Sequence, residues 1–189
     1  KESLKILKET DALLEGHFIL SSGLRSEKYI QCAKLLSKPK EAKELCLSLA
    51  EKIKEKFKNI DLILSPAIGG IVIGYEIGRI LGLETIFAER VNENFQLRRG
   101  FEIKQGQKIL IVEDVITTGK SSFECSNLGS KVGAEVVGYA CLIDRSNGKS
   151  KINKQIVSQV EINIPTYKEE EIPKHLKDKK AIKPGSRNL

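Results

Sequence analysis

Apolar and polar positions follow two different rhythms along the middle of the chain. Between residues 41 and 57, apolar side chains recur every three or four positions with lysines and glutamates between them, a spacing typical of an amphipathic helix. Residues 61–70, DLILSPAIGG, form a short apolar run that ends in a proline and paired glycines. This run predicts a buried strand that leads into a loop.

Further segments continue this alternation to about residue 150. We predict strands over residues 85–89, 108–114 and 135–144, and a helix over residues 121–132 that is closed by Gly133. Another helix is predicted where glycines recur every four residues on one face, which lets the helix approach a sheet closely. These glycines are Gly70, Gly74, Gly78 and Gly82. The whole pattern predicts an α/β fold with a mostly parallel central sheet flanked by helices.

The two ends of the chain lack this alternation. We expect a single domain over residues 1–189, with a core of about 37–150 and a small cap made of about 1–36 and 151–189. The cap is predicted over the carboxyl edge of the sheet, where open α/β sheets bind ligands.

Composition narrows the class of protein. Hydrophobic residues make up 40% and charged residues 30% of the chain, which is a globular balance. Because no apolar run approaches the roughly 18 residues of a membrane span and Lys1 and Glu2 do not open a signal peptide, we expect a cytoplasmic protein. The four cysteines have no metal-binding or disulfide spacing, so we interpret them as buried thiols.

The net charge of +7 permits nucleic-acid binding, but an enzyme of anionic substrates would carry the same charge. Residues 168–187 hold seven Lys or Arg and four Asp or Glu, so part of the excess lies in one C-terminal segment. A nucleic-acid partner is therefore not expected.

Residues 109–122, ILIVEDVITTGKSS, carry the candidate chemistry. Four apolar residues lead to the carboxylates of Glu113 and Asp114, which can accept hydrogen bonds from a ribose diol. The hydroxyl-rich turn that follows opens a predicted helix, and a helix N-terminus is a usual place for a phosphate. A Walker A loop is excluded, because Asp114 stands where that loop needs a glycine. A purely structural strand and capped helix would leave both carboxylates unexplained, so we predict a sugar-phosphate site.

On these residues the sequence resembles the type I phosphoribosyltransferases, whose signature is a hydrophobic strand, an acidic pair and a phosphate loop. The resemblance implies that Glu113 and Asp114 hold the ribose hydroxyls of PRPP (5-phosphoribosyl 1-diphosphate). The loop that would hold its 5-phosphate consists of Val115, Ile116, Thr117, Thr118, Gly119, Lys120 and Ser121. Lys120 departs from the small residue often found there, which leaves its role open.

Three further stretches resemble the orotate enzymes of this family. Residues 16–36 resemble the loop over the base, which implies orotate contacts from Ser22 and Gly23, although any surface hairpin could carry such residues. Residues 65–70, SPAIGG, resemble the pyrophosphate loop, which implies PRPP contacts from Gly69 and Gly70.

The third stretch, LIDRSNG, places Arg145 where the family has its orotate-binding arginine. A planar guanidinium suits a flat ring that bears a carboxylate. In the family the threonine that matches Thr117 also faces the orotate, so this role is assigned to Thr117 by resemblance.

The chain also departs from the orotate enzymes. Many of them have lysine at the positions of Ser21 and Gly69, and their flexible loop carries lysines and a histidine. The corresponding residues 87–103 hold three arginines and neither lysine nor histidine. We therefore expect the catalytic charge to come from Arg99, Arg98 or Arg90, with Arg99 favoured because it precedes a glycine that could act as a hinge. The polar segment 92–100 is the expected closing loop.

The resemblance implies transfer of ribose 5-phosphate from PRPP to orotate, which gives orotidine 5′-monophosphate and pyrophosphate on the route to UMP. It also implies magnesium carried by PRPP, with no direct protein metal site, and a homodimer. Two alternatives remain: a purine phosphoribosyltransferase with the same cradle, and a PRPP-sensing regulator of the same fold that binds nucleic acid.

Overall fold

The computed structural model of the protein describes residues 2–20 and 22–184. The chain divides into two compact units, the larger of which is Pro39–Ile162. The smaller unit combines Lys1–Lys38 with Asn163–Leu189. Within the described residues, no helix is long and apolar enough to cross a membrane.

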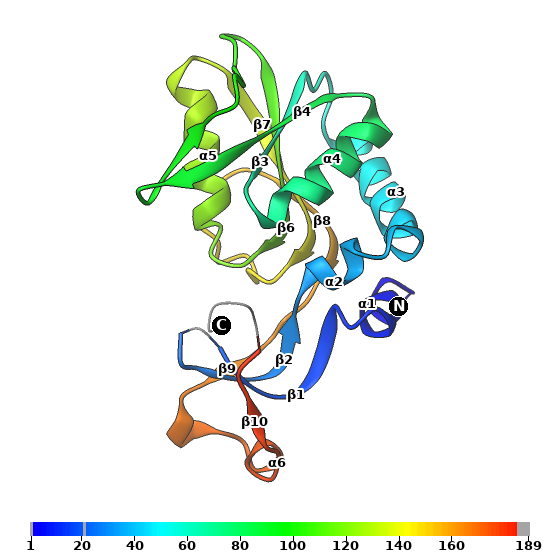
Figure 1. Ribbon diagram of the computed structural model, residues 1–189, viewed down its shortest axis with the longest axis vertical. Coiled ribbons are helices and arrows are strands. Elements are labelled where there is room, and N and C mark those ends of the chain that lie inside the picture. Colours follow the sequence, from blue (N-terminus) through cyan, green and yellow to red (C-terminus); the bar gives the residue numbers. More distant parts are fainter. Residues whose placement is uncertain (1, 21, 185–189) are drawn as a thin grey trace. The chain divides into compact units, whose positions relative to one another are not determined.

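The larger unit is built on a six-stranded sheet in the order β5-β4-β3-β6-β7-β8 (Figure 1). Every neighbouring pair is parallel except the antiparallel pair β4 and β5. The predicted α/β class with a mostly parallel sheet is therefore confirmed. The strands are β3 (Leu62–Pro66), β4 (Glu84–Val91), β5 (Asn94–Leu97), β6 (Lys108–Ile116), β7 (Glu135–Asp144) and β8 (Ile156–Glu161).

Helices cover both faces of this sheet. On one face, α3 (Pro39–Lys56) and α4 (Gly69–Leu81) pack against each other, and α5 (Lys120–Lys131) lies on the opposite face (Figure 1). The predicted apolar face of α3 is confirmed, because its buried residues are Ala42, Leu45, Cys46, Leu49, Ala50 and Ile53. All four cysteines of the chain are buried thiols, as the sequence predicted.

The glycines of α4 explain how closely this helix lies on the sheet. An ideal Cβ on Gly70 would lie 3.1 Å from the carbonyl oxygen of Val112, and one on Gly74 would overlap the hydroxyl of Ser65. Gly78 approaches the sheet in the same way. The predicted close approach is confirmed for these three glycines and wrong for Gly82, which ends the helix at a φ of 68° with nothing within 4 Å of its Cβ position.

The smaller unit contains a four-stranded sheet in the order β10-β1-β2-β9. Its centre is the antiparallel hairpin of β1 (Leu13–Ile19) and β2 (Arg25–Ile30). Two-residue strands flank the hairpin, β9 (Thr166–Tyr167) beside β2 and β10 (Ala181–Ile182) beside β1. The helical segments of this unit are α1 (Glu2–Glu9), α2 (Cys32–Leu36), the 3₁₀ turn η1 (Glu169–Glu171) and α6 (Lys174–Lys177).

The boundary after the core corrects the sequence prediction. We expected the cap to resume at about Lys151, but β8 pairs with β7 and belongs to the large sheet, so the larger unit extends to Ile162. The connection between these two parallel strands contains no helix. Parallel neighbours are usually joined through a helix. Because this connection has none, the sequence there lacks the alternation of strand and helix that would have marked β8 as a core strand.

Candidate active site

Five strands of the larger unit end at the same edge of the sheet, because β4, β3, β6, β7 and β8 all run in one direction. Open α/β sheets bind ligands at this edge. Most of the predicted PRPP-binding, orotate-binding and catalytic residues of this unit lie at or just beyond these strand ends: Gly69 and Gly70 after β3, Arg90 near the end of β4, residues 113–121 at the end of β6, and Arg145 after β7. Arg98 and Arg99 follow β5, which runs back from this edge so that its last residue, Leu97, lies opposite Ala88.

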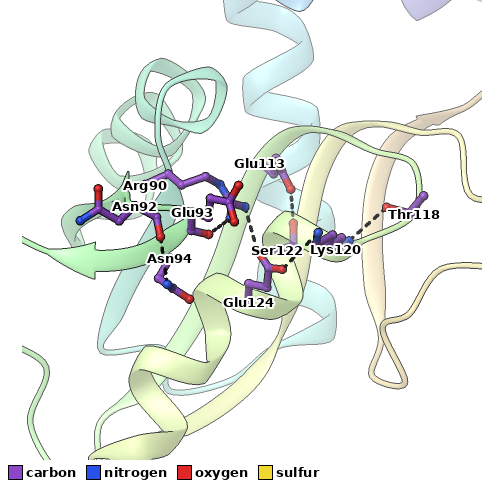
Figure 2. Close-up of polar contacts among 9 residues, drawn as sticks. All are labelled: Arg90, Asn92, Glu93, Asn94, Glu113, Thr118, Lys120, Ser122 and Glu124. Atoms are coloured by element: carbon purple, nitrogen blue, oxygen red, sulfur yellow. Dashed lines mark hydrogen bonds and ion pairs between the residues drawn. The ribbon is translucent and has the colours of Figure 1, made fainter. Parts of the chain in front are cut away.

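Glu113 faces α5. Ser122, which is fully buried in the first turn of that helix, donates a hydrogen bond from its hydroxyl to Oε2 of Glu113 (Figure 2). Burial raises the pKa of Glu113 to about 7, the hydrogen bond from Ser122 opposes this rise, and the neighbouring charge of Asp114 adds to it. Near pH 7 the carboxyl group therefore exists in both protonation states.

Asp114 lies on the other face of the sheet, against the loop after β3. An ideal Cβ on Gly69 would lie 2.9 Å from both carboxylate oxygens of Asp114, so only a glycine lets the backbone come this close. Burial raises the pKa of Asp114, and the backbone N–H of Val115, 2.9 Å from Oδ1, opposes the rise. In the same loop the peptide bond between Ala67 and Ile68 is cis.

Consecutive residues of a strand point to opposite faces, which explains why the acidic pair is divided. Glu113 faces the helix that follows the predicted phosphate loop, and Asp114 faces the predicted pyrophosphate loop. The two carboxylates therefore have different neighbours, which the sequence motif alone did not show.

Only the middle of the predicted phosphate loop, Thr117 to Gly119, is a tight turn, because its first two residues end β6 and its last two begin α5. Gly119 takes a φ of 73°, and an ideal Cβ there would lie 2.9 Å from a side-chain carbon of Ile152. The carbonyl of Thr118 accepts a hydrogen bond from the N–H of Lys151 at 2.8 Å. The segment after β7 thus holds the loop from behind and leaves the side chains of Thr117 and Thr118 exposed.

Lys120, whose role the sequence left open, begins α5 with a mostly exposed side chain. Its Nζ lies 3.8 Å from Oε1 of Glu124, one helical turn later. The ammonium group is therefore directed toward a carboxylate in this structure.

Arg145 lies beside the end of β6, because its backbone N–H donates to the carbonyl of Ile116 at 2.8 Å. Its Nε is buried and has no hydrogen-bond partner among residues 2–20 and 22–184. Burial lowers the pKa of this guanidinium. A buried, unsatisfied N–H is costly to leave without an acceptor, so Arg145 is suited to bind an anionic or carbonyl-bearing ligand.

Arg90 lies on the α5 face of β4 and holds the following hairpin. Its guanidinium donates to Oε2 of Glu124 at 2.7 Å and to the carbonyl of Glu93, and it stacks on Phe95 with 4.2 Å to the ring centroid. Figure 2 shows Glu124 between Arg90 and Lys120.

Arg98 and Arg99 share one carboxylate, that of Glu89. Arg99 forms two hydrogen bonds with it, both of 2.9 Å, and Nη1 of Arg98 lies 3.8 Å from Oε1. The pairing lowers the pKa of Glu89 and raises that of Arg99, in each case mainly through the hydrogen bonds.

The expected loop over residues 92–100 is partly a strand, because β5 pairs with β4. Asn92 and Glu93 form the two-residue connection with φ values of 47° and 68°. These are the positive values that a tight hairpin turn requires. The sequence prediction missed this hairpin because neither position is a glycine.

Ser22 and Gly23 lie in the smaller unit, in the turn between β1 and β2. The N–H of Gly23 donates to the carbonyl of Leu20 at 2.9 Å, and Gly23 has a φ of 84°. Their contact with orotate stays a prediction, and Ser21 lies outside the described residues. The two histidines, for which no catalytic role was predicted, also lie in this unit, His17 buried in β1 and His175 beside Glu27.

Three residues of the candidate site were not predicted from the sequence. Ser122, Glu124 and Glu89 each pair with a residue that the motifs had identified. Only the spacing of Lys120 and Glu124, one helical turn apart, offered a signal in the sequence. The other pairings join different elements or follow from the hairpin.

Comparison with known proteins identifies the family of the chain. The family model described as "Phosphoribosyl transferase domain" matches residues 33–179. The chain is 49% identical over 181 residues to the orotate phosphoribosyltransferase of Sphingopyxis alaskensis, a match that covers 95% of this chain and 92% of the relative.

Solved structures share the fold. The crystal structure of orotate phosphoribosyltransferase from Aeropyrum pernix matches with a TM-score of 0.73 at 23% identity, over 84% of this chain and 92% of that chain. The crystal structure of adenine phosphoribosyltransferase from Thermoanaerobacter pseudethanolicus matches with a TM-score of 0.61 at 19% identity, over 71% of this chain and 88% of that chain. At these identities the two structures speak for the fold alone, and they do not distinguish between the bases.

Proposed function

The chain belongs to the phosphoribosyl transferase domain family, and from that premise we propose that it is an orotate phosphoribosyltransferase, which joins the ribose 5-phosphate of PRPP to orotate and releases pyrophosphate. The product is orotidine 5′-monophosphate, a precursor of UMP. The observation that carries the proposal is the end of β6, where an acidic pair is followed, after two intervening residues, by the exposed hydroxyls of the turn into α5.

Each part of this edge has a role in the proposed reaction. The carboxylates of Glu113 and Asp114 accept hydrogen bonds from the ribose hydroxyls, and the loop of Val115 to Ser121 holds the 5-phosphate at the start of α5. Gly69 and Gly70 let the backbone after β3 approach the pyrophosphate. Division of the acidic pair between the two faces of the sheet suits this, because a ribose lies between its 5-phosphate and its pyrophosphate.

The base is oriented by Arg145 and Thr117. The free Nε–H of Arg145 supports a contact with orotate, because a bound carboxylate or ring carbonyl would satisfy it. An orotate contact from Ser22 and Gly23 stays a prediction of the resemblance. With the base held in place, a ring nitrogen of orotate attacks the anomeric carbon and the bond to pyrophosphate breaks.

Negative charge gathers on the departing pyrophosphate, and arginines offset it. Arg99 and Arg98 are the proposed donors, since their shared partner Glu89 lies on the same face of the sheet as Asp114. Arg90 is placed on the opposite face, where Glu124 and Phe95 hold it. Its predicted catalytic role is therefore the weakest of the three.

We propose that magnesium accompanies PRPP. The fit rests on the chemistry of the donors, because Mg²⁺ prefers oxygen ligands and the carboxylate oxygens of Asp114 lie against the pyrophosphate loop. When bound, the ion would supply positive charge to the pyrophosphate oxygens.

A homodimer is also proposed, in line with the resemblance. One face of α4 exposes the apolar side chains of Val72 and Tyr75, which are 53% and 66% exposed, and Ile68, just before the helix, is 85% exposed. An apolar stripe of this kind on a single chain suggests a surface that another chain covers. We place the enzyme in the cytoplasm, because four buried cysteines that form no disulfide suit a reducing compartment.

The test is a comparison of substrates. Purified protein is supplied with PRPP, magnesium and either orotate or adenine, and loss of each base is followed by its ultraviolet absorbance. Consumption of orotate alone supports the proposal. Turnover of adenine in place of orotate would establish the purine alternative, and binding of PRPP without turnover of either base would favour the regulator.

A further inference from the structure

Glu89 is the shared partner of the two arginines that the proposed reaction uses. Its side chain is only 20% exposed, whereas those of Arg98 and Arg99 are 57% and 58% exposed. The carboxylate is therefore the fixed member of the cluster, and the guanidinium groups reach it from the turn after β5.

The position of Glu89 places this cluster beside the predicted pyrophosphate loop. The carbonyl of Ala88 accepts a hydrogen bond from the N–H of Ala67, the first residue after β3, at 2.8 Å. Glu89 is the next residue along β4, so it extends beyond the last point at which this loop is attached to the strand.

Glu89 also lies on the same face of the sheet as α4 and Asp114. An ideal Cβ on Gly74 of α4 would lie 3.7 Å from a side-chain carbon of Thr85, so Thr85 faces α4. Because side chains alternate along a strand, Phe87 and Glu89 share that face. Asp114 lies on it too, against the first residue of α4.

The turn that bears the arginines is itself well fixed. Phe101 packs edge-on against Phe87 with 5.2 Å between ring centroids, and its N–H donates to the carbonyl of Arg98 at 3.0 Å. Arg99, which follows Arg98 in this turn, takes a φ of 60°, and its guanidinium lies 5.6 Å from the centroid of the Phe87 ring. The pairing with Glu89 then selects one direction for a long, exposed side chain.

We propose that Glu89 is a positioning residue of the phosphoribosyl transfer, which acts through Arg99 and Arg98 by holding their guanidinium groups at the pyrophosphate loop before the substrate arrives. This inference rests on the proposed function. The carboxylate engages Nε and Nη2 of Arg99, and a guanidinium has further N–H groups to offer. Pyrophosphate oxygens can therefore bind the arginine while Glu89 keeps its orientation. Two arginines on one carboxylate also leave net positive charge for the leaving group.

The first test is the substitution Glu89→Gln. The amide keeps the size of the side chain but loses its charge and can accept at one oxygen only, so the fork to Arg99 is lost. Because pre-placed charge acts mainly in the transition state, kcat is expected to fall about tenfold while KM for PRPP changes much less. Glu89→Asp keeps a carboxylate and should retain more of the kcat than the amide does.

A double-mutant cycle separates positioning from a general structural role. Arg99→Ala alone should lower kcat by roughly 10²-fold, the scale of losing one oriented donor. If Glu89 acts through Arg99, adding Glu89→Gln to Arg99→Ala should lower kcat little further. The matched control is Glu76→Gln, which removes a similar fork, of 2.8 and 2.9 Å, from Arg79 on α4. It should leave kcat at the parent value.

Three results would overturn the inference: parent kcat in Glu89→Gln, a higher kcat/KM for PRPP in that variant, or an equal loss of kcat with and without Arg99. The second result would mean that Glu89 competes with pyrophosphate for the arginines. If Glu89→Gln melts below the assay temperature, Glu89→Asp replaces it in the double-mutant cycle. The inference then requires that Glu89→Asp lowers kcat far less in the Arg99→Ala background than in the parent. Failure of the parent protein to consume orotate would instead overturn the proposed function.

Discussion

At the scale of single residues, the two adjacent carboxylates of the motif occupy different environments. Glu113 is buried against Ser122 of α5, and Asp114 is buried against Gly69 of the loop after β3. Burial raises the pKa of both groups, so each is more costly to ionise in the folded protein than in the unfolded chain. Ionisation of these two carboxyl groups therefore lowers the stability of the folded protein.

The first prediction follows from the pKa of Glu113, which is raised from 4.5 to about 7. The folded state binds this proton more tightly than the unfolded state, so the free energy of unfolding falls as the pH rises from about 4.5 to about 7. Glu113→Gln should reduce this fall. At pH 8 it should raise the free energy of unfolding by on the order of 1 kcal/mol or more, and the melting temperature with it. Thermal unfolding of both proteins from pH 4.5 to 8 measures the effect.

The control for this series is Glu51→Gln on the exposed surface of α3, which removes a carboxylate outside the core and should keep the parent melting temperature at pH 8. A Glu113→Gln protein with the same pH dependence as the parent would show that Glu113 titrates at its ordinary value in the folded state.

The second prediction concerns the base. Arg145→Ala should weaken orotate binding by about 1.5–3 kcal/mol, the range for losing a hydrogen bond to a charged group, and leave PRPP binding nearly unchanged. Calorimetric titration measures the affinity for each ligand. Orotate is titrated in the presence of pyrophosphate, the product released from PRPP. An equal loss of PRPP affinity would rule out a role restricted to the base.

The candidate residues at the end of β6 and after β7 could be predicted because they follow one another in the sequence and match a motif. Glu89 and Glu124 could not be predicted, since each belongs to the candidate site only through its contact with an arginine of the β4–β5 hairpin or the turn after it. Such contacts depend on where the hairpin turns, and the turn at Asn92 and Glu93 has no glycine to mark it.

At the scale of the elements, α4 is the helix whose position the sequence determines most strongly. Its glycines recur every four residues, and in the structure three of them allow backbone contact with the sheet. The same spacing misled at Gly82, because a glycine that ends a helix and one that packs on a sheet look alike in a sequence.

The third prediction tests this contact. In Gly74→Ala the added methyl group would overlap the hydroxyl of Ser65, which is itself buried without a hydrogen-bond partner among the described residues. We expect a loss of about 1–3 kcal/mol of stability, the usual range for overpacking, in chemical denaturation.

Removing the obstructing hydroxyl is the matching control. Ser65→Ala/Gly74→Ala should recover part of the loss, although the Cβ of Ser65 would still lie 3.1 Å from the new methyl group. Identical stability of the single and double variants would show that the helix shifts to relieve the overlap elsewhere.

At the scale of the whole molecule, the fold class could be predicted from strand and helix patterns, whereas the division into units could be predicted only in part. The first boundary was expected at about residue 36, near the observed Lys38. The second was displaced to Ile162 because β8 follows β7 without a helix between them. Pairing between distant strands leaves little local trace in the sequence, and this also explains why β9 and β10 were not predicted.

The fourth prediction concerns assembly. Tyr75→Glu places a charge in the exposed apolar stripe of α4 and should convert the proposed dimer to a monomer, because burying an unpaired charge at an interface is costly. Light scattering after size-exclusion chromatography gives the mass of each protein. Leu47→Glu, at an exposed position of α3, is the control and should keep the parent mass. A monomeric parent protein, or a Tyr75→Glu protein of unchanged dimer mass, would remove α4 as the contact surface.

If the end of β6 is a PRPP cradle in an enzyme of orotate, the substitution Asp114→Asn should disable it. The measurement is the rate of orotate loss for parent and variant, with and without PRPP and magnesium, beside the melting temperature of each protein. We predict that the parent consumes orotate only when both are present. Asp114→Asn should lose most of this rate while its melting temperature stays or rises, because burial disfavours the charge that the substitution removes. An Asp114→Asn protein that consumes orotate at the parent rate, or that unfolds while activity per folded molecule persists, would contradict the account.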